Sequence, residues 1–203
     1  MGIRLALLDM DGTLTTVTSP WQYVHEQLGI WEAKGLPLLD SWLEGEISYE
    51  TFCIEDAKAW SDLGLNLDQV YEILATIPVP PQTDAFLGKL HRQGTSIAII
   101  STGFSYNARV IFERAGIPLE EVAIAANELA EKDGVIVPAL NVVAGDGAGG
   151  KAAWSRRMME RYGATPAETG AVGDSSADIP MFESVEHHFK VSGPKDLHLI
   201  PWI

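Results

Sequence analysis

Three short polar clusters in this sequence contain residue types that suit the binding of a metal ion and a phosphate group. Each cluster directly follows a short apolar stretch. The clusters are Asp9 and Asp11 after residues 3–8, Ser101 and Thr102 after residues 96–100, and Asp174 and Asp178 after residues 169–172. Apolar stretches of this length, bounded by polar turns, are typical of buried strands. The sequence therefore predicts that each cluster begins where a strand ends.

The position of these clusters indicates what they could do together. In an open sheet of parallel strands, ligands bind beyond the carboxyl ends of the strands, so the clusters are expected on one edge. Carboxylates packed together repel one another, and a divalent cation relieves that repulsion. Mg²⁺ is usually held by one or two carboxylates with water and phosphate oxygens. The residues thus predict a Mg²⁺ site suited to phosphoryl chemistry.

Helical patterns alternate with the predicted strands and indicate the fold class. Each of three such patterns ends at a glycine, the residue preferred just after a helix. They cover Thr83–Gln93, Ser105–Ala115 and Ala152–Tyr162, before Gly94, Gly116 and Gly163. Alternating strands and helices favour an α/β fold with a mainly parallel sheet, as a Rossmann-like core of three layers. Lys132-Asp133-Gly134, between two short apolar pieces, predicts a hairpin.

Residues 15–80 interrupt this alternation. Four helical stretches follow one another there without a strand, starting near Pro20, Glu32, Ser48 and Asn66. We interpret residues 15–80 as a helical cap inserted into a core made of residues 1–14 and 81–203. The cap has 11 Asp and Glu residues against Lys34 and Lys58, so its net charge is -9 (2 minus 11).

Composition excludes several classes of protein. The chain has 203 residues, 46% of them hydrophobic, and a formal net charge of -14. A chain this acidic is a poor match for nucleic acid or an anionic membrane, because phosphate backbones are bound by clustered Lys and Arg. The apolar stretches are far shorter than the roughly 20 residues that cross a bilayer. With a single cysteine, Cys53, and no secretory signal, a cytoplasmic location is expected.

Four segments together resemble the motifs of the haloacid dehalogenase superfamily, in the order in which that superfamily has them. The segments are Asp9-Met10-Asp11-Gly12-Thr13, Ser101 after its apolar strand, Lys151, and Gly173-Asp174-Ser175-Ser176-Ala177-Asp178. The stretches IAIISTGF and GDSSADIPMF are most similar to the phosphoserine-phosphatase-like branch. The resemblance covers nearly the whole chain. It implies a hydrolase with a helical cap of the C1 type, inserted after the first motif.

The resemblance implies a two-step reaction on a small phosphorylated metabolite. Asp9 would be the nucleophile and form an aspartyl-phosphate. Asp11 would protonate the leaving oxygen and then deprotonate the hydrolytic water. Asp9 and Asp174, with the backbone carbonyl of Asp11, would hold Mg²⁺.

The other matching residues would hold the phosphoryl group. Ser101, the Thr102 amide and Lys151 would contact its oxygens as charge shifts in the reaction. Asp178 would orient Lys151 or a metal-bound water. The class of enzyme implied is therefore a Mg²⁺-dependent phosphoric monoester hydrolase.

The residues expected to recognise phosphoserine itself are missing. Where phosphoserine phosphatases have a glutamate after the first motif and an arginine in the cap, this chain has Thr18 and Ile54. Neither can bind a carboxylate as a forked guanidinium does. Ala177 stands where the branch often has Asn. The prediction is a phosphatase of unnamed substrate, with a phosphoserine phosphatase proper as the alternative.

Two further hypotheses concern the cap and the class of protein. Trp21 or Tyr23, with an acid of the cap, could line the substrate pocket and favour an apolar or amine-bearing leaving group. An alternative of another class is a catalytically silent relative that binds a phosphorylated ligand or a partner protein. Retention of Asp9, Asp11, Lys151 and Asp174 together argues against it.

A P-loop is the main rival interpretation of Lys151. Residues 145–152 nearly spell GxxxxGK[ST], but Ala152 stands where the motif needs a hydroxyl for Mg²⁺. The preceding strand signal is also weak. Nucleotide hydrolysis is therefore the less favoured interpretation.

Overall fold

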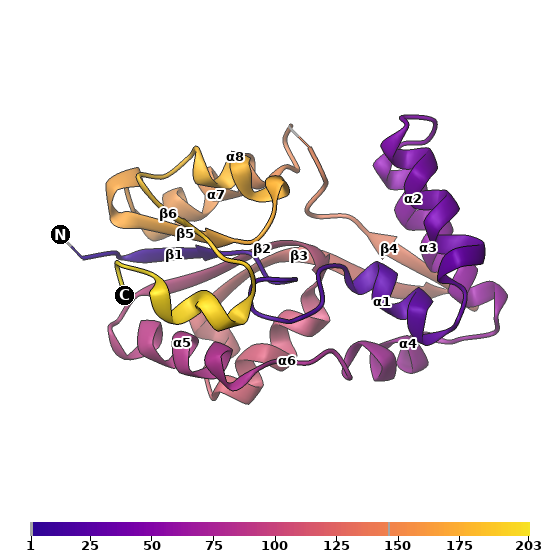
Figure 1. Ribbon diagram of the computed structural model, residues 1–203, viewed down its shortest axis with the longest axis horizontal. Helices are drawn as coiled ribbons and strands as arrows, with labels where there is room; N and C mark the ends of the chain where they lie inside the picture. The colour runs from indigo at the N-terminus through magenta and orange to yellow at the C-terminus, as the bar shows by residue number, and fades with distance from the viewer. Residues whose placement is uncertain (1, 146) are drawn as a thin grey trace.

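A mostly parallel sheet runs through the middle of the protein (Figure 1). The computed structural model describes residues 2–145 and 147–203. Within them the sheet has six strands in the order β4-β3-β2-β1-β5-β6. The strands are β1 (Leu5–Leu8), β2 (Ser96–Phe104), β3 (Val122–Lys132), β4 (Val135–Ala139), β5 (Thr169–Gly173) and β6 (His187–Lys190). Only β3 and β4 pair antiparallel. The predicted α/β fold with a mainly parallel sheet is confirmed.

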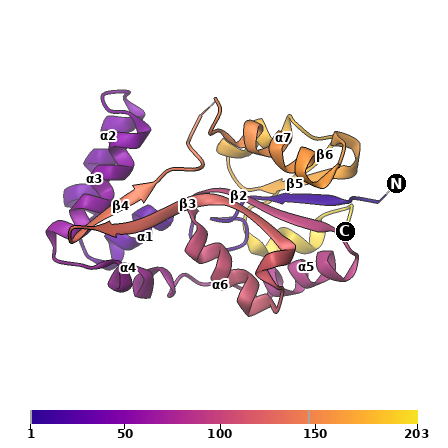
Figure 2. The same ribbon diagram turned by 180° about the vertical axis from the view of Figure 1, so that it is seen from behind.

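Helices cover both faces of this sheet, as Figures 1 and 2 show. One face is covered by α5 (Pro81–Arg92) and α6 (Ser105–Ala115), and the other by α7 (Lys151–Tyr162) and α8 (Ile179–Phe182). Side chains of β1 alternate between the two faces, as a period of two requires. Ala6 and Leu8 pack in the first apolar layer, and Leu5 and Leu7 in the second. Burial on both faces explains why the strand sequences are continuously apolar.

The four helical stretches of residues 15–80 form a separate group to one side of the sheet (Figure 1). The group consists of α1 (Pro20–Gln27), a π-helical turn (Trp31–Gly35) that runs into α2 (Leu36–Leu43), α3 (Tyr49–Asp62) and α4 (Leu67–Leu74). Ser19, Ser48 and Asn66 cap α1, α3 and α4 by accepting a backbone N–H, which fixes where these helices begin. Trp21, Trp60 and other buried side chains make the core of this group.

The β3–β4 hairpin reaches out from the sheet and packs against the helical group. Leu129 and Ile136 are buried in the apolar core of the helices. The Tyr71 hydroxyl donates to the Leu129 carbonyl (3.1 Å), and the Ile136 amide donates to Ser61 Oγ (2.9 Å). A hairpin was predicted here from the sequence, but its contact with the helices was not. None of the helices in the described residues is both long and apolar enough to cross a bilayer.

Candidate active site

The three polar clusters lie at one edge of the sheet because their strands are neighbours. Leu8 of β1 is in register with Ile99 of β2 on one side and with Val172 of β5 on the other. Asp9, Ser101 and Asp174 therefore lie side by side, one or two residues beyond these paired positions. Asp9, Asp11, Ser101, Lys151 and Asp178 are all buried, and Asp174 is half-buried.

The sequence predicts that strand β2 ends at Ile100, and this prediction is wrong. The strand continues to Phe104, and its register with β3 shifts between Ile100 and Phe104. Such an irregularity re-aims side chains at the end of a strand. Ser101 and Thr102 thus lie within an irregular strand rather than in the loop that was predicted.

Lys151 joins the first and last clusters. Its Nζ donates to Asp9 Oδ1 (2.5 Å) and to Asp178 Oδ1 (2.6 Å). Burial alone would lower the pKa of Lys151, but the charges of Asp9 and Asp178 outweigh burial and raise that pKa. The ammonium is therefore fully charged at any physiological pH.

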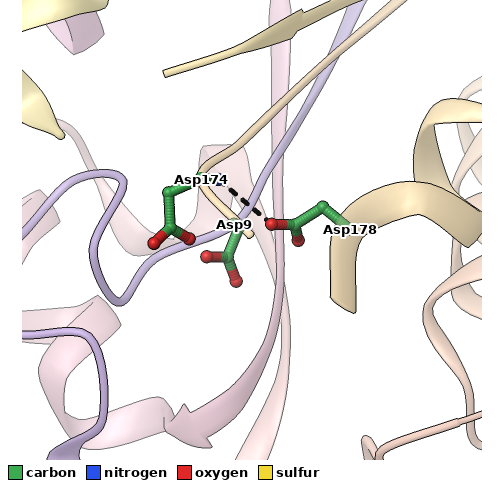
Figure 3. Close-up of side chains that lie close together, drawn as sticks. All are labelled: Asp9, Asp174 and Asp178. Atoms are coloured by element: carbon green, nitrogen blue, oxygen red, sulfur yellow. Dashed lines mark hydrogen bonds between the residues drawn. The ribbon is translucent and has the colours of Figure 1, made fainter. Parts of the chain in front are cut away.

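Asp178 is held on its other oxygen by backbone. Its Oδ2 accepts the amides of Asp174 (3.1 Å) and Ser175 (3.0 Å). The first of these bonds is the dashed line in Figure 3. Both carboxylate oxygens of Asp178 are thus in use, which suits a residue that positions Lys151.

Asp11 lies beside Ser101 in an environment that favours its protonated form. Ser101 Oγ donates to Asp11 Oδ2 (2.9 Å) and accepts the Gly103 amide (2.9 Å). Asp11 Oδ1 is buried without a hydrogen-bond partner among the described residues. Burial, and next the charge of Asp9, raise the pKa of Asp11 to about 8. At pH 7 this carboxyl can hold a proton, as a general acid must.

Asp9, Asp174 and Asp178 form a cluster that fits a metal ion. Each offers an oxygen within 4.8 Å of the others, and Figure 3 shows their carboxyl groups close together. Thr13 Oγ1 lies 3.2 Å from Asp9 Oδ2 and 3.5 Å from Asp174 Oδ1, so this hydroxyl bridges the carboxylates of Asp9 and Asp174. Burial and neighbouring acids raise the pKa of Asp9, to about 7, and of Asp174.

These observations select the residues best placed to bind the ion. An all-oxygen donor set suits a hard cation such as Mg²⁺. Asp9 and Asp174 fit best, since each accepts fewer hydrogen bonds than Asp178, whose oxygens are held by Lys151 and by two backbone amides. The predicted contribution of the Asp11 backbone carbonyl stays a prediction.

Glycines allow the site to close this tightly. A Cβ on Gly12 would collide with the carboxylate of Asp174, and one on Gly103 with that of Asp11. Gly12 also has φ of +77°, a conformation that other residues rarely adopt. The glycine of the first motif is therefore required by the site as well as by the turn.

Asn127 is a site residue that the sequence analysis missed. It is fully buried near the end of β3. Its Nδ2 donates to the Thr102 carbonyl (2.9 Å), and its Oδ1 accepts the amides of Asn141 (2.8 Å) and Val142 (2.9 Å). It thereby ties β2 to the segment that leads to Lys151. A lone amide after the apolar run VAIAA was the available signal.

The structure argues against a pocket-lining role for Trp21 and Tyr23. Trp21 is 5% exposed and packs on Phe104, with ring centroids 4.5 Å apart. The Tyr23 hydroxyl is paired with Thr76 Oγ1 (2.8 Å), within the helical group. Trp21 instead donates its indole N–H to the Thr102 carbonyl (3.2 Å).

The geometry also disfavours the P-loop interpretation. The strand before the glycine-rich segment is β4, which is antiparallel and at the edge of the sheet, whereas a P-loop needs a strand that leads directly into its helix. The Lys151 ammonium contacts two carboxylates, Asp9 and Asp178. Asp146, within this segment, lies outside the described residues.

Fold and site together define a class of protein: an α/β protein with inserted helices, whose acidic site at the strand ends contains one lysine. The chain belongs to the haloacid dehalogenase-like hydrolases, whose family model matches residues 6–183. The resemblance seen in the four motifs is confirmed.

Comparisons with individual proteins agree with this assignment. The chain is 24% identical to a phosphoserine phosphatase of Halobacterium salinarum over 182 residues, covering 90% of this chain and 82% of the relative. A substrate-bound phosphoserine phosphatase structure is similar in fold, with a TM-score of 0.73 at 20% identity, over 98% of this chain and 99% of that chain. A phospho-aspartyl intermediate analogue of a phosphoserine phosphatase has a TM-score of 0.71 at 21% identity, over 98% and 91%. The likeness to these two structures is a likeness of fold.

Proposed function

We propose that this protein is a Mg²⁺-dependent phosphatase that hydrolyses a small phosphomonoester through an aspartyl-phosphate on Asp9. The observation that carries the proposal is the Asp9 carboxylate, held by Lys151 at 2.5 Å with the protonatable Asp11 two residues along the chain. A bound Mg²⁺ would neutralise phosphate charge near the nucleophile. A cytoplasmic location is part of the proposal.

The residues of the chain divide the reaction between them. Asp9 attacks phosphorus, and its carboxylate oxygen forms the bond that replaces the ester bond. Asp11 gives its proton to the leaving alkoxide and later takes one from the water that cleaves the aspartyl-phosphate. Lys151 holds a phosphoryl oxygen and must release part of its present contact with Asp9 when phosphate binds, whereas Ser101 shares its hydroxyl hydrogen between Asp11 and a phosphoryl oxygen.

Hydrolysis of p-nitrophenyl phosphate tests this proposal. Activity is expected with Mg²⁺ and is expected to disappear with a chelator. Asp9→Asn keeps the shape of the side chain but removes the nucleophile, so we expect a loss of at least about a thousandfold. Glu186→Gln, at an exposed acid outside the site, is the control and should keep full activity.

Two results would contradict the proposal. A wild-type protein without phosphatase activity would favour the silent, ligand-binding alternative. Equal activity in Asp9→Asn and wild type would exclude Asp9 as the nucleophile. Acid-quenched wild-type protein should also contain the covalent phosphate, and Asp9→Asn should not.

The substrate is proposed to have a leaving group without a second anionic group. Within the cap, Lys34 and Lys58 are the only cations, and both lie in a groove between α2 and α3 that does not include the site residues. Ile54, where an arginine was expected, is exposed. Nothing in the helical group therefore supplies the charge that a phosphoserine carboxylate needs.

A panel of phosphorylated compounds tests the leaving group. We expect phosphoethanolamine, phosphocholine and aryl phosphates to be hydrolysed faster than phosphoserine or phosphoglycolate. A panel in which compounds with an anionic tail rank first would reject this part of the proposal. Lys195, which lines a cavity beside Asp174 and Thr18, would then be the residue to replace, because it is the one cation in that lining.

A further inference from the structure

We propose that Trp21 is a positioning residue that aligns the general acid Asp11 from the cap. This inference rests on the proposed function, because it concerns how the leaving oxygen receives its proton. In this role Trp21 orients the peptide plane between Thr102 and Gly103 and does not contact substrate.

A continuous set of hydrogen bonds connects the indole of Trp21 to the carboxyl of Asp11. The Trp21 N–H donates to the Thr102 carbonyl (3.2 Å). On the other side of that same peptide, the Gly103 N–H donates to Ser101 Oγ (2.9 Å). Ser101 Oγ then donates to Asp11 Oδ2 (2.9 Å).

The planarity of the peptide bond makes this connection effective. Because the carbonyl of Thr102 and the N–H of Gly103 lie in one plane, holding the carbonyl sets the direction of the N–H. With one lone pair occupied by the Gly103 N–H, the Ser101 hydroxyl is directed at Asp11. Asp11 Oδ1, which has no partner among the described residues, is left to hold the transferable proton.

Trp21 is itself held in place. Its side chain is 5% exposed, and its ring lies 4.5 Å from Phe104 and 5.7 Å from Trp60 between centroids. Asn127, from the sheet, is the second donor to the Thr102 carbonyl (2.9 Å). Of these two donors, Trp21 is the one that belongs to the helical group, so it connects the position of that group directly to the Thr102 carbonyl.

A displaced general acid has a distinctive kinetic effect. An alkoxide is a poor leaving group and needs the proton from Asp11, whereas p-nitrophenolate leaves readily without it. Loss of alignment should therefore slow alkyl phosphates much more than p-nitrophenyl phosphate. A general loosening of the fold would slow both by the same factor.

The test compares Trp21→Phe with Trp60→Phe at saturating Mg²⁺. Both replacements remove an indole N–H from the same aromatic cluster, but the N–H of Trp60 bonds His25 Nδ1 (3.1 Å), away from the Thr102 peptide. The rates kcat and kcat/KM are measured with propyl phosphate and with p-nitrophenyl phosphate. Asp11→Asn is the reference for complete loss of the acid.

For Trp21→Phe we expect kcat/KM, which includes only the steps up to release of the leaving group, to fall about tenfold for propyl phosphate and less than about threefold for p-nitrophenyl phosphate. For Trp60→Phe the two rates should change by the same factor. Equal losses on both substrates in Trp21→Phe would overturn the inference. If Trp21→Phe does not fold, 3-benzothienylalanine at position 21 keeps the ring shape and replaces only the N–H, and the same two outcomes apply.

Failure of the inference can be told apart from failure of the proposed function. If wild type hydrolyses both esters and Asp11→Asn affects propyl phosphate selectively, the proposed function stands. Absence of that selectivity in Trp21→Phe then rejects the role of Trp21 alone. If wild type hydrolyses neither ester, the proposed function and this inference fail together.

Discussion

Most acidic residues of the site have a defined hydrogen-bond or ion-pair partner. Lys151 neutralises part of the charge of Asp9 and Asp178, Ser101 bonds Asp11, and Asp174 keeps the greatest exposure to solvent. The raised pKa values of Asp9 and Asp11 reflect the burial that remains uncompensated. A metal ion between Asp9 and Asp174 would remove most of this cost.

Gly12→Ala tests the close approach of the first and last motifs. A Cβ at this position meets the Asp174 carboxylate, so the variant should displace a proposed metal ligand. We expect the Mg²⁺ concentration needed for half-maximal activity to rise at least about tenfold, measured by Mg²⁺ titration of p-nitrophenyl phosphate hydrolysis.

Gly29→Ala is a matched control for this prediction. Gly29 has φ of +67°, close to the +77° of Gly12, but a Cβ there meets nothing within 4 Å. The two variants should lose similar stability from the backbone, about 1 kcal/mol each. A Mg²⁺ requirement that changes equally in both would show that the Asp174 contact is unimportant.

At the scale of elements, the β3–β4 hairpin gives the helical group its support. Its turn residues, Asp133 and Gly134, both have positive φ (54° and 77°), as a type I′ turn requires. The Leu67 amide at the start of α4 donates to Glu131 Oε2 (3.0 Å), in addition to the contacts of Leu129 and Ile136. The helices after β1 therefore depend on a segment more than 50 residues further along the chain.

Ile136→Ala tests this support. Ile136 is 1% exposed in the core of the helical group, so its truncation should leave a cavity and lower the free energy of unfolding by about 2 to 4 kcal/mol. Val135→Ala is the control, because Val135 is the preceding residue on the opposite face and is 42% exposed. Its effect should stay within about 0.5 kcal/mol. Urea denaturation of both variants measures the difference, and equal effects would refute the supporting role.

At the scale of the whole molecule, the negative charge is divided between two regions of different character. The net charge of residues 15–80 is -9 of the total of -14, and the acids there mostly lie on the outside of the helices. The remaining -5 includes the buried carboxylates of the site. Screening by salt affects the first region, whereas in the second a bound cation would relieve the repulsion that Lys151 leaves.

Mg²⁺ is therefore expected to stabilise the entire fold. Binding at about 100 times Kd contributes about 2.7 kcal/mol, which for a chain of this size raises Tm by roughly 5 to 10 °C. Asp174→Asn should abolish most of the increase, and Glu186→Gln should keep it. Thermal unfolding with Mg²⁺ and with a chelator measures both, at constant ionic strength. An equal increase in Asp174→Asn would place the ion elsewhere.

The elements were largely predictable because their signals are local. The C′ glycines of α6 and α7, the caps of α3 and α4, and the hairpin turn all act within a few residues of one another. The predicted end of strand β2 was wrong. The irregularity after Ile100 arises from pairing with β3, and such pairing has no local sequence signal. The role of Asn127 was missed for the same reason, since its partners lie 14 to 25 residues away in the chain.

By itself, the sequence determined which side chains could meet, because residues that end neighbouring parallel strands must share an edge of the sheet. Only the tertiary structure decided how they meet. In the structure, Lys151 lies between Asp9 and Asp178. Trp21 donates a hydrogen bond to Thr102 instead of lining a substrate pocket, and the β3–β4 hairpin packs against the helical group. The physical reason is that strand ends follow from patterns of burial along the chain, whereas the direction of each side chain depends on packing and hydrogen bonds between distant segments.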